Sequence, residues 1–209
     1  MGRLLLVRHG ETPWNAEGRW QGQTDVPLSP RGRCQAAALA RVLAADTVHA
    51  LYASDLWRAR ETALILAKPL GLPVHTEPRL REMAFGHWEG LTYDEIEQRD
   101  AKTLTAWYAD PLQVAPPGGE TLAQVSERVQ AVLTCLVSFC QEHTAVLVAH
   151  GGPLRVLLCL ALGLPPQAHW QFVLAPGSLT ELRIEAQGTV LWRLNETQHL
   201  TGRNHGRCR

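Results

Sequence analysis

The stretch LLLVRHGETPWN, residues 4–15, sets four apolar residues directly before Arg8 and His9. A short continuous apolar run of this kind predicts a central strand that is buried on both faces. The sequence after it is rich in turn-forming residues, so the strand ends close to His9. Arg8 and His9 are therefore either a solvated start of a loop or a functional pair held at the tip of a strand.

Apolar runs and helical patterns alternate along the rest of the chain. Strands are predicted for residues 48–53, 74–76 and 145–149, with a final antiparallel pair at residues 179–184 and 189–194. Helices are predicted for residues 30–45, 55–70, 121–143 and 153–162, and two short ones within residues 92–109. Ser29 and Asp55 are the candidate caps of the first two helices, and Thr121 opens the third. This alternation predicts a three-layer α/β fold, with an open, mostly parallel sheet covered by helices on both faces.

Length and composition fit one domain with a sizeable core. The chain has 209 residues, of which 45% are apolar, and no formal net charge. We expect a single domain over residues 1–198 and a disordered basic tail over residues 199–209. The neutral balance gives no reason to expect a nucleic acid or an anionic membrane as partner.

Targeting and redox signals favour a cytoplasmic protein. No signal peptide is recognisable, and no apolar run approaches the ~18 residues of a membrane span. The five cysteines form no CxxC pair and are expected to be ordinary thiols in a reducing cytosol. No sequence pattern addresses the oligomeric state, and a homodimer remains a hypothesis.

Three of the predicted strands end in charged or titratable residues. The first ends in Arg8 and His9, the second leads into a segment that ends with Arg58, and the third ends in His150 and Gly151. Ligands bind beyond the carboxyl ends of parallel strands in sheets of this kind. We therefore expect two histidines and two arginines to meet at one edge of the sheet.

Such a constellation suits phosphoryl transfer without a metal. Arginine guanidinium groups match phosphate oxygens in a bidentate way and keep their charge. A neutral histidine can attack phosphorus, while the second histidine and the arginines stabilise the charge on the equatorial oxygens. A carboxyl group is also needed to protonate the leaving alkoxide.

The motifs resemble those of one family. RHGETPWN (8–15) is similar to the signature of the histidine phosphatase superfamily, also called the phosphoglycerate mutase-like superfamily. Five further segments resemble the family in the same order: DVPLSPRGRCQA (25–36), YASDLWRARETA (52–63), LREMAFGHWEG (80–90), GGET (118–121) and VAHGGPLR (148–155). The resemblance spans about residues 3–160. It implies the phosphoglycerate mutase-like fold and a small phosphate monoester as substrate, with no cofactor and no metal.

The resemblance also implies roles for individual residues. His9 is expected to be the nucleophile that becomes phosphohistidine, with Arg8, Arg58 and His150 around the phosphoryl oxygens. Glu82 is expected to contact the substrate, protonate the leaving oxygen and then take a proton from water. Glu89, one short loop away, is the rival carboxylate. Further substrate or phosphate contacts are implied for Asn15, Gln21, Gly22 and Gly151.

Within the superfamily, the resemblance favours a phosphatase. Mutases carry a longer insertion after the acid, whereas about 35 residues separate Glu82 from Gly118 here, and Gly152 stands where mutases usually have asparagine. LREMAFGHWEG and residues 162–184 are similar to the α-ribazole phosphatases of cobalamin nucleotide-loop assembly. The predicted substrate is therefore α-ribazole 5′-phosphate. The alternatives are a phosphosugar or broad-specificity phosphatase, a phosphoglycerate mutase, and a non-catalytic phosphate-binding protein.

Selectivity is expected to depend on the region after Glu82. Residues 92–117 are the candidate lid over the substrate. Trp20 and Trp88 lie in loops that flank the motifs, which makes them candidates for stacking on a dimethylbenzimidazole ring.

Overall fold

The sheet of the protein has six strands in the order β3-β2-β4-β1-β5-β6. The structure is a computed structural model and describes residues 2–201. β1, β2, β3 and β4 run parallel to one another, while β5 is antiparallel to both β1 and β6. The strands are β1 (Gly2–Arg8), β2 (Ala50–Ala53), β3 (Val74–Thr76), β4 (Thr144–Ala149), β5 (Leu179–Glu185) and β6 (Gly188–Glu196).

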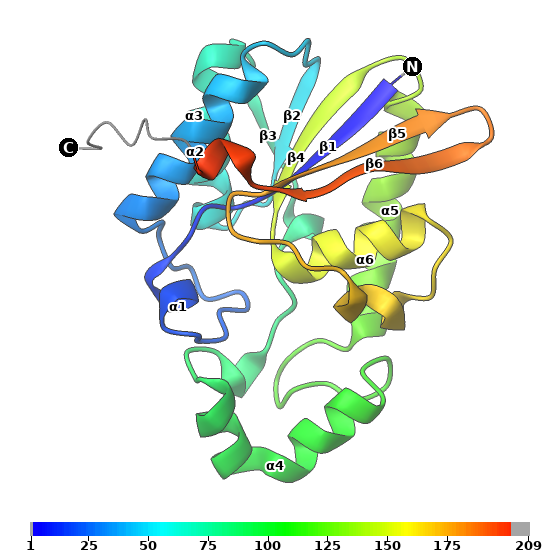
Figure 1. Cartoon of the computed structure of the whole chain (residues 1–209). Helices are drawn as coiled ribbons and strands as arrows, with labels where there is room; N and C mark the ends of the chain where they lie inside the picture. The colour runs from blue at the N-terminus through cyan, green and yellow to red at the C-terminus, as the bar shows by residue number, and fades with distance from the viewer. Residues whose placement is uncertain (1, 202–209) are drawn as a thin grey trace.

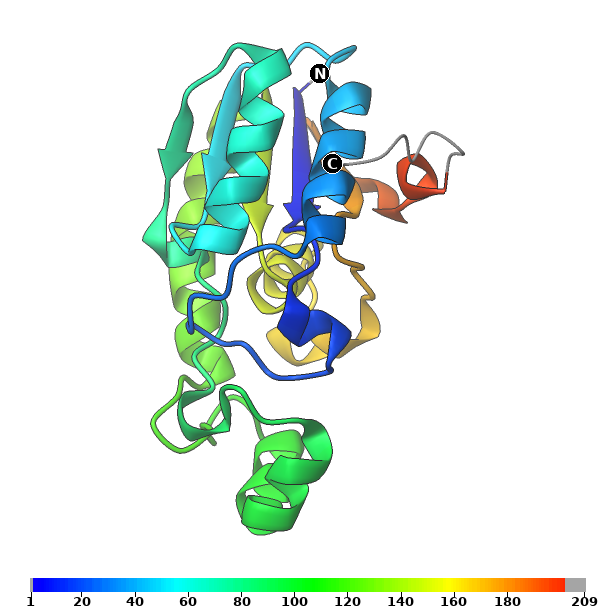
Figure 2. The ribbon, with the colours of Figure 1, turned by 90° about the vertical axis from the view of Figure 1, so that its left-hand side faces the viewer.

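Helices cover both faces of the sheet, as Figures 1 and 2 show. α2 and α3 lie on one face, α5 and α6 lie on the other, and α4 lies beyond the carboxyl ends of the parallel strands. The helices are α1 (Pro13–Ala16), α2 (Pro30–Leu43), α3 (Trp57–Leu70), α4 (Tyr93–Ala109), α5 (Leu122–Phe139) and α6 (Gly151–Ala161). The short 3₁₀ helices are η1 (Pro78–Leu80), η2 (Gly86–Trp88), η3 (Pro166–Gln171) and η4 (Gln198–Leu200). The predicted three-layer, mostly parallel architecture is confirmed.

The apolar side chains of β1 pack into the hydrophobic cores on both faces of the sheet. Each of residues 4–7 is at most 1% exposed. Leu5 and Val7 pack toward α2 and α3, whereas Leu4 and Leu6 pack toward α5 and α6. Because successive side chains of a strand point to opposite faces, a strand buried on both sides must be apolar at every position. This double burial holds the end of β1, and with it Arg8 and His9, in a fixed place.

Of the two predicted helix caps, the structure confirms Ser29 and contradicts Asp55. Ser29 and Thr121 cap α2 and α5 through their side chains. The prediction for Asp55 is wrong: α3 starts after Leu56 without a side-chain cap. Asp55 instead accepts two hydrogen bonds from Arg81, at 2.8 and 2.6 Å. Because both oxygens of the Asp55 carboxylate bind the guanidinium group of Arg81, the carboxylate does not cap the helix.

α4 bends in the middle, which agrees with the two short helices predicted for residues 92–109. The backbone of Asp100 is non-helical there, with φ −148° and ψ 40°. The Trp88 indole N–H donates to the Asp100 carboxylate at 3.1 Å. This contact ties the bend to η2 and turns the second half of α4 back toward the site.

The start of the predicted tail is ordered. Residues 198–200 form η4, and the His199 ring contacts the Gly177 carbonyl oxygen at 2.9 Å. The expectation of disorder is therefore wrong for residues 199–201, and residues 202–209 lie outside the described part of the chain. Cys135, Cys140 and Cys159 are thiols as expected, but Cys34 is disulfide-bonded, contrary to that expectation. Over residues 2–201, no helix is both long and apolar enough to span a membrane.

Candidate active site

Three adjacent parallel strands bring the predicted residues together. β4 lies between β1 and β2, so His9, Arg58 and His150 meet beyond their carboxyl ends. The rings of His9 and His150 have centroids 5.1 Å apart, and Arg58 Nε lies 3.1 Å from His150 Nδ1. The prediction that these strand ends converge is confirmed.

His9 is held as a neutral ring. It is 2% exposed, and its Nδ1 lies 2.7 Å from the Gly10 carbonyl oxygen. Because a carbonyl only accepts, Nδ1 carries the proton and Nε2 keeps its lone pair. Burial lowers the pKa of His9 well below its ordinary value, and the charges of Arg58 and Arg8 lower it further. His9 therefore presents a nucleophilic nitrogen at neutral pH.

Arg58 is fully buried and fixed by three acceptors. Its Nε donates to His150 Nδ1, its Nη1 to the Thr24 carbonyl at 2.8 Å, and its Nη2 to the Gly22 carbonyl at 2.6 Å. A guanidinium group has five N–H donors, so donors remain for a ligand. The loop that carries Gly22 thus orients Arg58 before a substrate arrives.

Arg8 faces the same space with an unused donor. Its Nη1 donates to the Leu174 carbonyl, while its Nε is buried and has no hydrogen-bond partner among the described residues. Burial lowers the pKa of Arg8 to about 10, which leaves the guanidinium charged at neutral pH. Together with Arg58, it supplies two positive charges for a phosphoryl group.

His150 supports Arg58 from behind. Its Nδ1 accepts from Arg58 Nε, so its Nε2 carries the proton and lies 2.9 Å from Ser54 Oγ. Both ring nitrogens are engaged, and the ring does not line the cavity at the site. Its observed role is to position Arg58, while direct contact with a phosphoryl oxygen stays a prediction.

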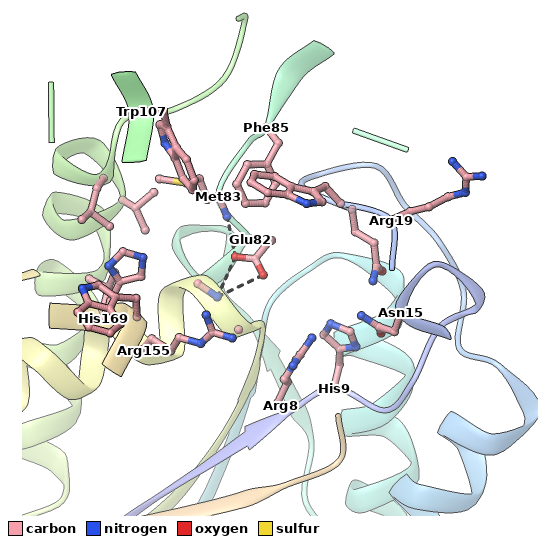
Figure 3. Close-up of a pocket in the computed structure, with 18 of the residues that line it drawn as sticks. Arg8, His9, Asn15, Arg19, Glu82, Met83, Phe85, Trp107, Arg155 and His169 are labelled. Atoms are coloured by element: carbon pink, nitrogen blue, oxygen red, sulfur yellow. Dashed lines mark hydrogen bonds between the residues drawn. The ribbon is translucent and has the colours of Figure 1, made fainter. Parts of the chain in front are cut away.

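Glu82 is docked on the amino end of α6 (Figure 3). Its Oε1 accepts from the backbone N–H groups of Met83 at 2.9 Å and Gly152 at 3.0 Å. A Cβ atom on Gly152 would lie 2.3 Å from this oxygen, so a larger residue there would push the carboxylate out of this position. Oε2 lies 3.3 Å from the Gly152 nitrogen and is the freer oxygen for proton transfer.

The segment that carries Glu82 is clamped by Arg128 of α5. Arg128 donates to the carbonyl oxygens of Arg79, Arg81 and Glu82 at 2.7 to 3.1 Å. It also pairs with the Glu120 carboxylate at 3.0 Å. These contacts fix the position of Glu82 without touching the cavity.

The rival carboxylate, Glu89, has a structural role. It accepts hydrogen bonds from the backbone N–H groups of Gln23, Thr24 and Phe85, at 2.9 to 3.1 Å. A Cβ atom on Gly22 would lie 1.9 Å from Glu89 Oε1, and Gly22 has a φ of +53°. Glu89 thus holds the loop that orients Arg58 and does not line the cavity. Of the two candidates, Glu82 is the one placed to act as the acid.

A cavity of about 380 Å³ contains most of the predicted residues. One part, which we call the phosphate side, is lined by Arg8, His9, Asn15, Gln21, Arg58 and Gly151. Glu82 also lines the cavity, whereas Gly22 and His150 lie behind it and contact Arg58. Asn15 Oδ1 is held by the Thr12 backbone N–H at 3.0 Å, which leaves its amide N–H₂ group for a ligand.

The other part, which we call the leaving-group side, is aromatic. It is lined by Trp107, Tyr108, Arg155, His169 and Trp170. A second cavity of about 450 Å³ adjoins it and shares the aromatic residues and His169. Trp170 is 71% exposed at its mouth, whereas Trp107 packs edge-on against Trp20 with ring centroids 5.5 Å apart.

Trp20 and Trp88, the two tryptophans predicted to stack on the substrate, lie in different environments. Trp20 lines the first cavity, so its contact with substrate stays a prediction. Trp88 is 2% exposed, is bonded to Asp100 and does not line either cavity, so the proposal is wrong for Trp88. Within residues 92–117, the predicted lid, the structure forms α4, and Trp107 and Tyr108 of this helix line the cavity.

Sequence reasoning missed the leaving-group side. Trp107 lies on α4 after the bend at Asp100, and Trp170 lies on η3. No local sequence pattern indicated either contact. Arg155 did have a signal, since it lies four residues after Gly151 on one helix and therefore on the same face.

Comparisons with known proteins agree with this geometry. A model of the histidine phosphatase superfamily (branch 1) matches residues 4–197. Phosphoserine phosphatase 1 of Hydrogenobacter thermophilus is 36% identical over 200 residues, which cover 96% of this chain and 95% of that protein. Adenosylcobalamin/α-ribazole phosphatase of Escherichia coli is 34% identical over 193 residues, which cover 92% of this chain and 95% of that protein.

A solved structure extends the match to three dimensions. The crystal structure of the α-ribazole phosphatase from Shigella flexneri has a TM-score of 0.86 at 33% identity, over 93% of this chain and 96% of that chain. The names of these relatives differ in the substrate and agree in the reaction.

Proposed function

The chain belongs to the histidine phosphatase superfamily and is a phosphoric monoester hydrolase; on that premise we propose that it hydrolyses α-ribazole 5′-phosphate through a phosphohistidine on His9. The phosphoryl group would occupy the phosphate side of the cavity, between Arg8 and Arg58. The nucleoside would extend along the leaving-group side.

The first step transfers the phosphoryl group to the enzyme. Nε2 of neutral His9 attacks phosphorus as the bond to the ester oxygen breaks, and the protonated Glu82 carboxyl donates its proton to that oxygen. The charged groups of Arg8 and Arg58 and the amide of Asn15 stabilise the charge spread over the equatorial oxygens. α-Ribazole leaves as the neutral alcohol.

The second step regenerates the enzyme. Glu82, now a carboxylate, takes a proton from a water molecule, and the oxygen of that water attacks the phosphorus of phosphohistidine. The bond between phosphorus and Nε2 breaks, inorganic phosphate leaves, and His9 returns to its neutral form. Glu82 ends the cycle protonated, as it began.

The aromatic cavity beside the phosphate side is the observation that supports the nucleoside substrate. Trp107, Tyr108 and Trp170 line a space of about 450 Å³ next to the reacting groups. Flat rings bind well between aromatic side chains. A sugar phosphate without a ring base would leave this apolar surface uncovered.

A substrate panel tests this proposal. We expect kcat/KM for α-ribazole 5′-phosphate to exceed that for fructose phosphates, 3-phosphoglycerate and p-nitrophenyl phosphate by about tenfold or more. A panel of equal values, or one led by a sugar phosphate, would overturn the α-ribazole assignment. An acid-labile, base-stable phosphate on His9 tests the phosphohistidine separately.

A matched pair of tryptophan variants tests the ring contact. Trp170→Ala is expected to lower kcat/KM for α-ribazole 5′-phosphate by about three- to tenfold and to leave the value for glycerol 3-phosphate, which has no ring, nearly unchanged. Trp192→Ala is the control, because Trp192 is 52% exposed on β6 and lines neither cavity. Equal values for the two variants would show that Trp170 does not bind the base.

A further inference from the structure

The GGET segment, residues 118–121, has no part in the reaction steps proposed above. It lies in the loop between α4 and α5, and its last residue, Thr121, caps α5. Glu120 does not line the cavity. Its contacts go instead to the segment that carries Glu82, which gives the motif a different use.

The backbone of the GGET loop pairs with the backbone that follows Glu82. The Glu120 N–H donates to the Ala84 carbonyl at 2.9 Å, and the His87 N–H donates to the Pro117 carbonyl at 2.9 Å. A Cβ atom on Gly119 would lie 2.4 Å from the Ala84 carbonyl oxygen, so a glycine there lets the two backbones approach this closely. The loop is thus fixed directly against the acid-bearing segment.

The carboxylate of Glu120 collects donors from three segments. Its Oε2 accepts from the Ala84 N–H at 2.9 Å and from Arg128 Nη2 at 3.0 Å, and its Oε1 accepts from Arg128 Nε at 3.0 Å. The Gln23 amide nitrogen makes longer contacts, at 3.4 Å to Glu120 Oε2 and 3.3 Å to the Glu82 carbonyl oxygen. Only a group with two acceptor oxygens and a negative charge satisfies this set of donors.

Glu82 is therefore held on both sides along the chain. Arg128 donates to the carbonyl oxygens of Arg79, Arg81 and Glu82, whereas Glu120 binds both backbone groups of Ala84. The bidentate pair between Glu120 and Arg128 joins these two sets of contacts. A proton donor must lie within hydrogen-bond reach of the ester oxygen, and a misplacement of about 1 Å can lower the rate about 100-fold.

We propose that Glu120 is a positioning residue for the acid step. Paired with Arg128, it holds the backbone of residues 82–84 so that the Glu82 carboxyl group stays within reach of the leaving oxygen. Glu120 itself touches neither the substrate nor the reacting atoms. The proposal rests on Glu82 as the acid of the proposed function, and it does not depend on which ester is the substrate.

Two aryl esters that differ in their need for a proton test it. Phenyl phosphate releases a more basic phenolate than p-nitrophenyl phosphate does, and kcat/KM covers the step in which that group departs. In Glu120→Gln, an amide nitrogen would face a donor of Arg128 or Ala84, so the segment would shift. We expect kcat/KM to fall about tenfold or more for phenyl phosphate and less than about threefold for p-nitrophenyl phosphate.

A double variant separates positioning of the acid from a general structural role. If Glu120 acts through Glu82, its replacement has little left to disturb once the acid is absent. We expect kcat/KM of Glu82→Gln/Glu120→Gln for phenyl phosphate to lie within about twofold of the value for Glu82→Gln. A merely structural role would lower kcat/KM by the same factor in both backgrounds.

Glu61→Gln is the matched control. Glu61 is a similarly covered carboxylate, 16% exposed against 21% for Glu120, and it pairs with Arg33 at 2.6 Å. It lies on α3 and does not line the cavity, so the ratio between the two esters should not change. Arg128→Met should lower this ratio as Glu120→Gln does, and Arg128→Lys, which keeps the charge, should retain part of it. Thermal unfolding of each variant checks that the fold is kept.

Several results would overturn the proposal. Wild-type values in Glu120→Gln, equal losses on the two esters, or an undiminished loss in the Glu82→Gln background would each show that Glu120 does not position the acid. If Glu120→Gln does not fold, Arg128→Lys decides by the same ratio. A lack of leaving-group dependence in Glu82→Gln alone would instead reject Glu82 as the acid, which distinguishes failure of the proposed function from failure of this inference.

Discussion

The two sides of the cavity differ in how their side chains are held. On the phosphate side, His9, Asn15 and Arg58 are each fixed by hydrogen bonds to the surrounding backbone or to neighbouring side chains, and Arg8 Nε and Gln21 Oε1 are buried without a partner among the described residues. On the leaving-group side, Trp107 Nε1 and Arg155 Nε have no partner among the described residues, and Trp170 is largely exposed. The residues proposed for the chemical steps are thus held in place before the substrate binds. Selectivity depends instead on side chains whose hydrogen-bond or packing partners the substrate must supply.

Removing the nucleophile should produce the largest effect. His9→Asn keeps a polar group near the Gly10 carbonyl but has no nitrogen that can attack phosphorus. We expect kcat for any phosphate monoester to fall by about 10⁴-fold or more, against tenfold or less for Trp170→Ala. Rapid-quench measurements of phosphate release with both variants would show the contrast. Retention of more than a few per cent of the activity in His9→Asn would mean that another group forms the intermediate.

Glu82 lies between the two sides, and its replacement should show a dependence on the leaving group. Glu82→Gln is expected to lower kcat by about 10²- to 10³-fold for alkoxide leaving groups and far less for p-nitrophenolate, which needs no proton. Steady-state kinetics on a series of esters with leaving groups of different basicity would measure this. Equal losses across the series would show that Glu82 is not the acid.

Glu89→Gln provides the matched control for Glu82. Its amide nitrogen would face either the backbone N–H group of Thr24 or those of Gln23 and Phe85, which are donors as well. We expect a loss of about 1–3 kcal/mol in the free energy of unfolding and no dependence of kcat on the leaving group. This outcome would separate a residue that holds the loop from one that transfers a proton.

The contrast between the sides also explains what could be predicted from the sequence. Arg8 and His9 directly follow an apolar run, and His150 directly follows another, so the strand order alone brings them together. Arg58 comes from the first turn of α3, close to the end of β2. A local sequence pattern, together with the geometry of parallel strands, is therefore sufficient to predict that such residues meet at the site.

The leaving-group side depends on contacts between distant segments. Trp107 is brought to the cavity by a bend at Asp100, and that bend is held by Trp88, which lies 12 positions earlier. The role of Asp55 was mistaken for the same reason, because its partner Arg81 lies 26 positions away. Patterns within one helix cannot reveal partners of this kind. For Arg155, by contrast, helical periodicity from Gly151 does predict a position on the face of α6 that lines the cavity.

A final prediction concerns stability at mildly acidic pH. His9 and His150 have pKa values well below the ordinary 6.5, chiefly because of burial, and burial also lowers the pKa of His169 on the leaving-group side. The unfolded chain binds a proton on each histidine as pH falls through about 6.5, whereas the folded protein does so only at lower pH. The free energy of unfolding should therefore decrease from pH 7 to pH 5, by up to about 1.4 kcal/mol per pH unit for each histidine.

Urea unfolding at pH 7, 6 and 5 would measure this slope. His9→Asn should reduce it by the share of one histidine, and His169→Asn should reduce it less, because the pKa of His169 is lowered less strongly. If His9→Asn left the slope unchanged, the folded protein would have to bind a proton on His9 near pH 6.5. The nucleophile would then be charged in the range where the phosphate side requires it to be neutral.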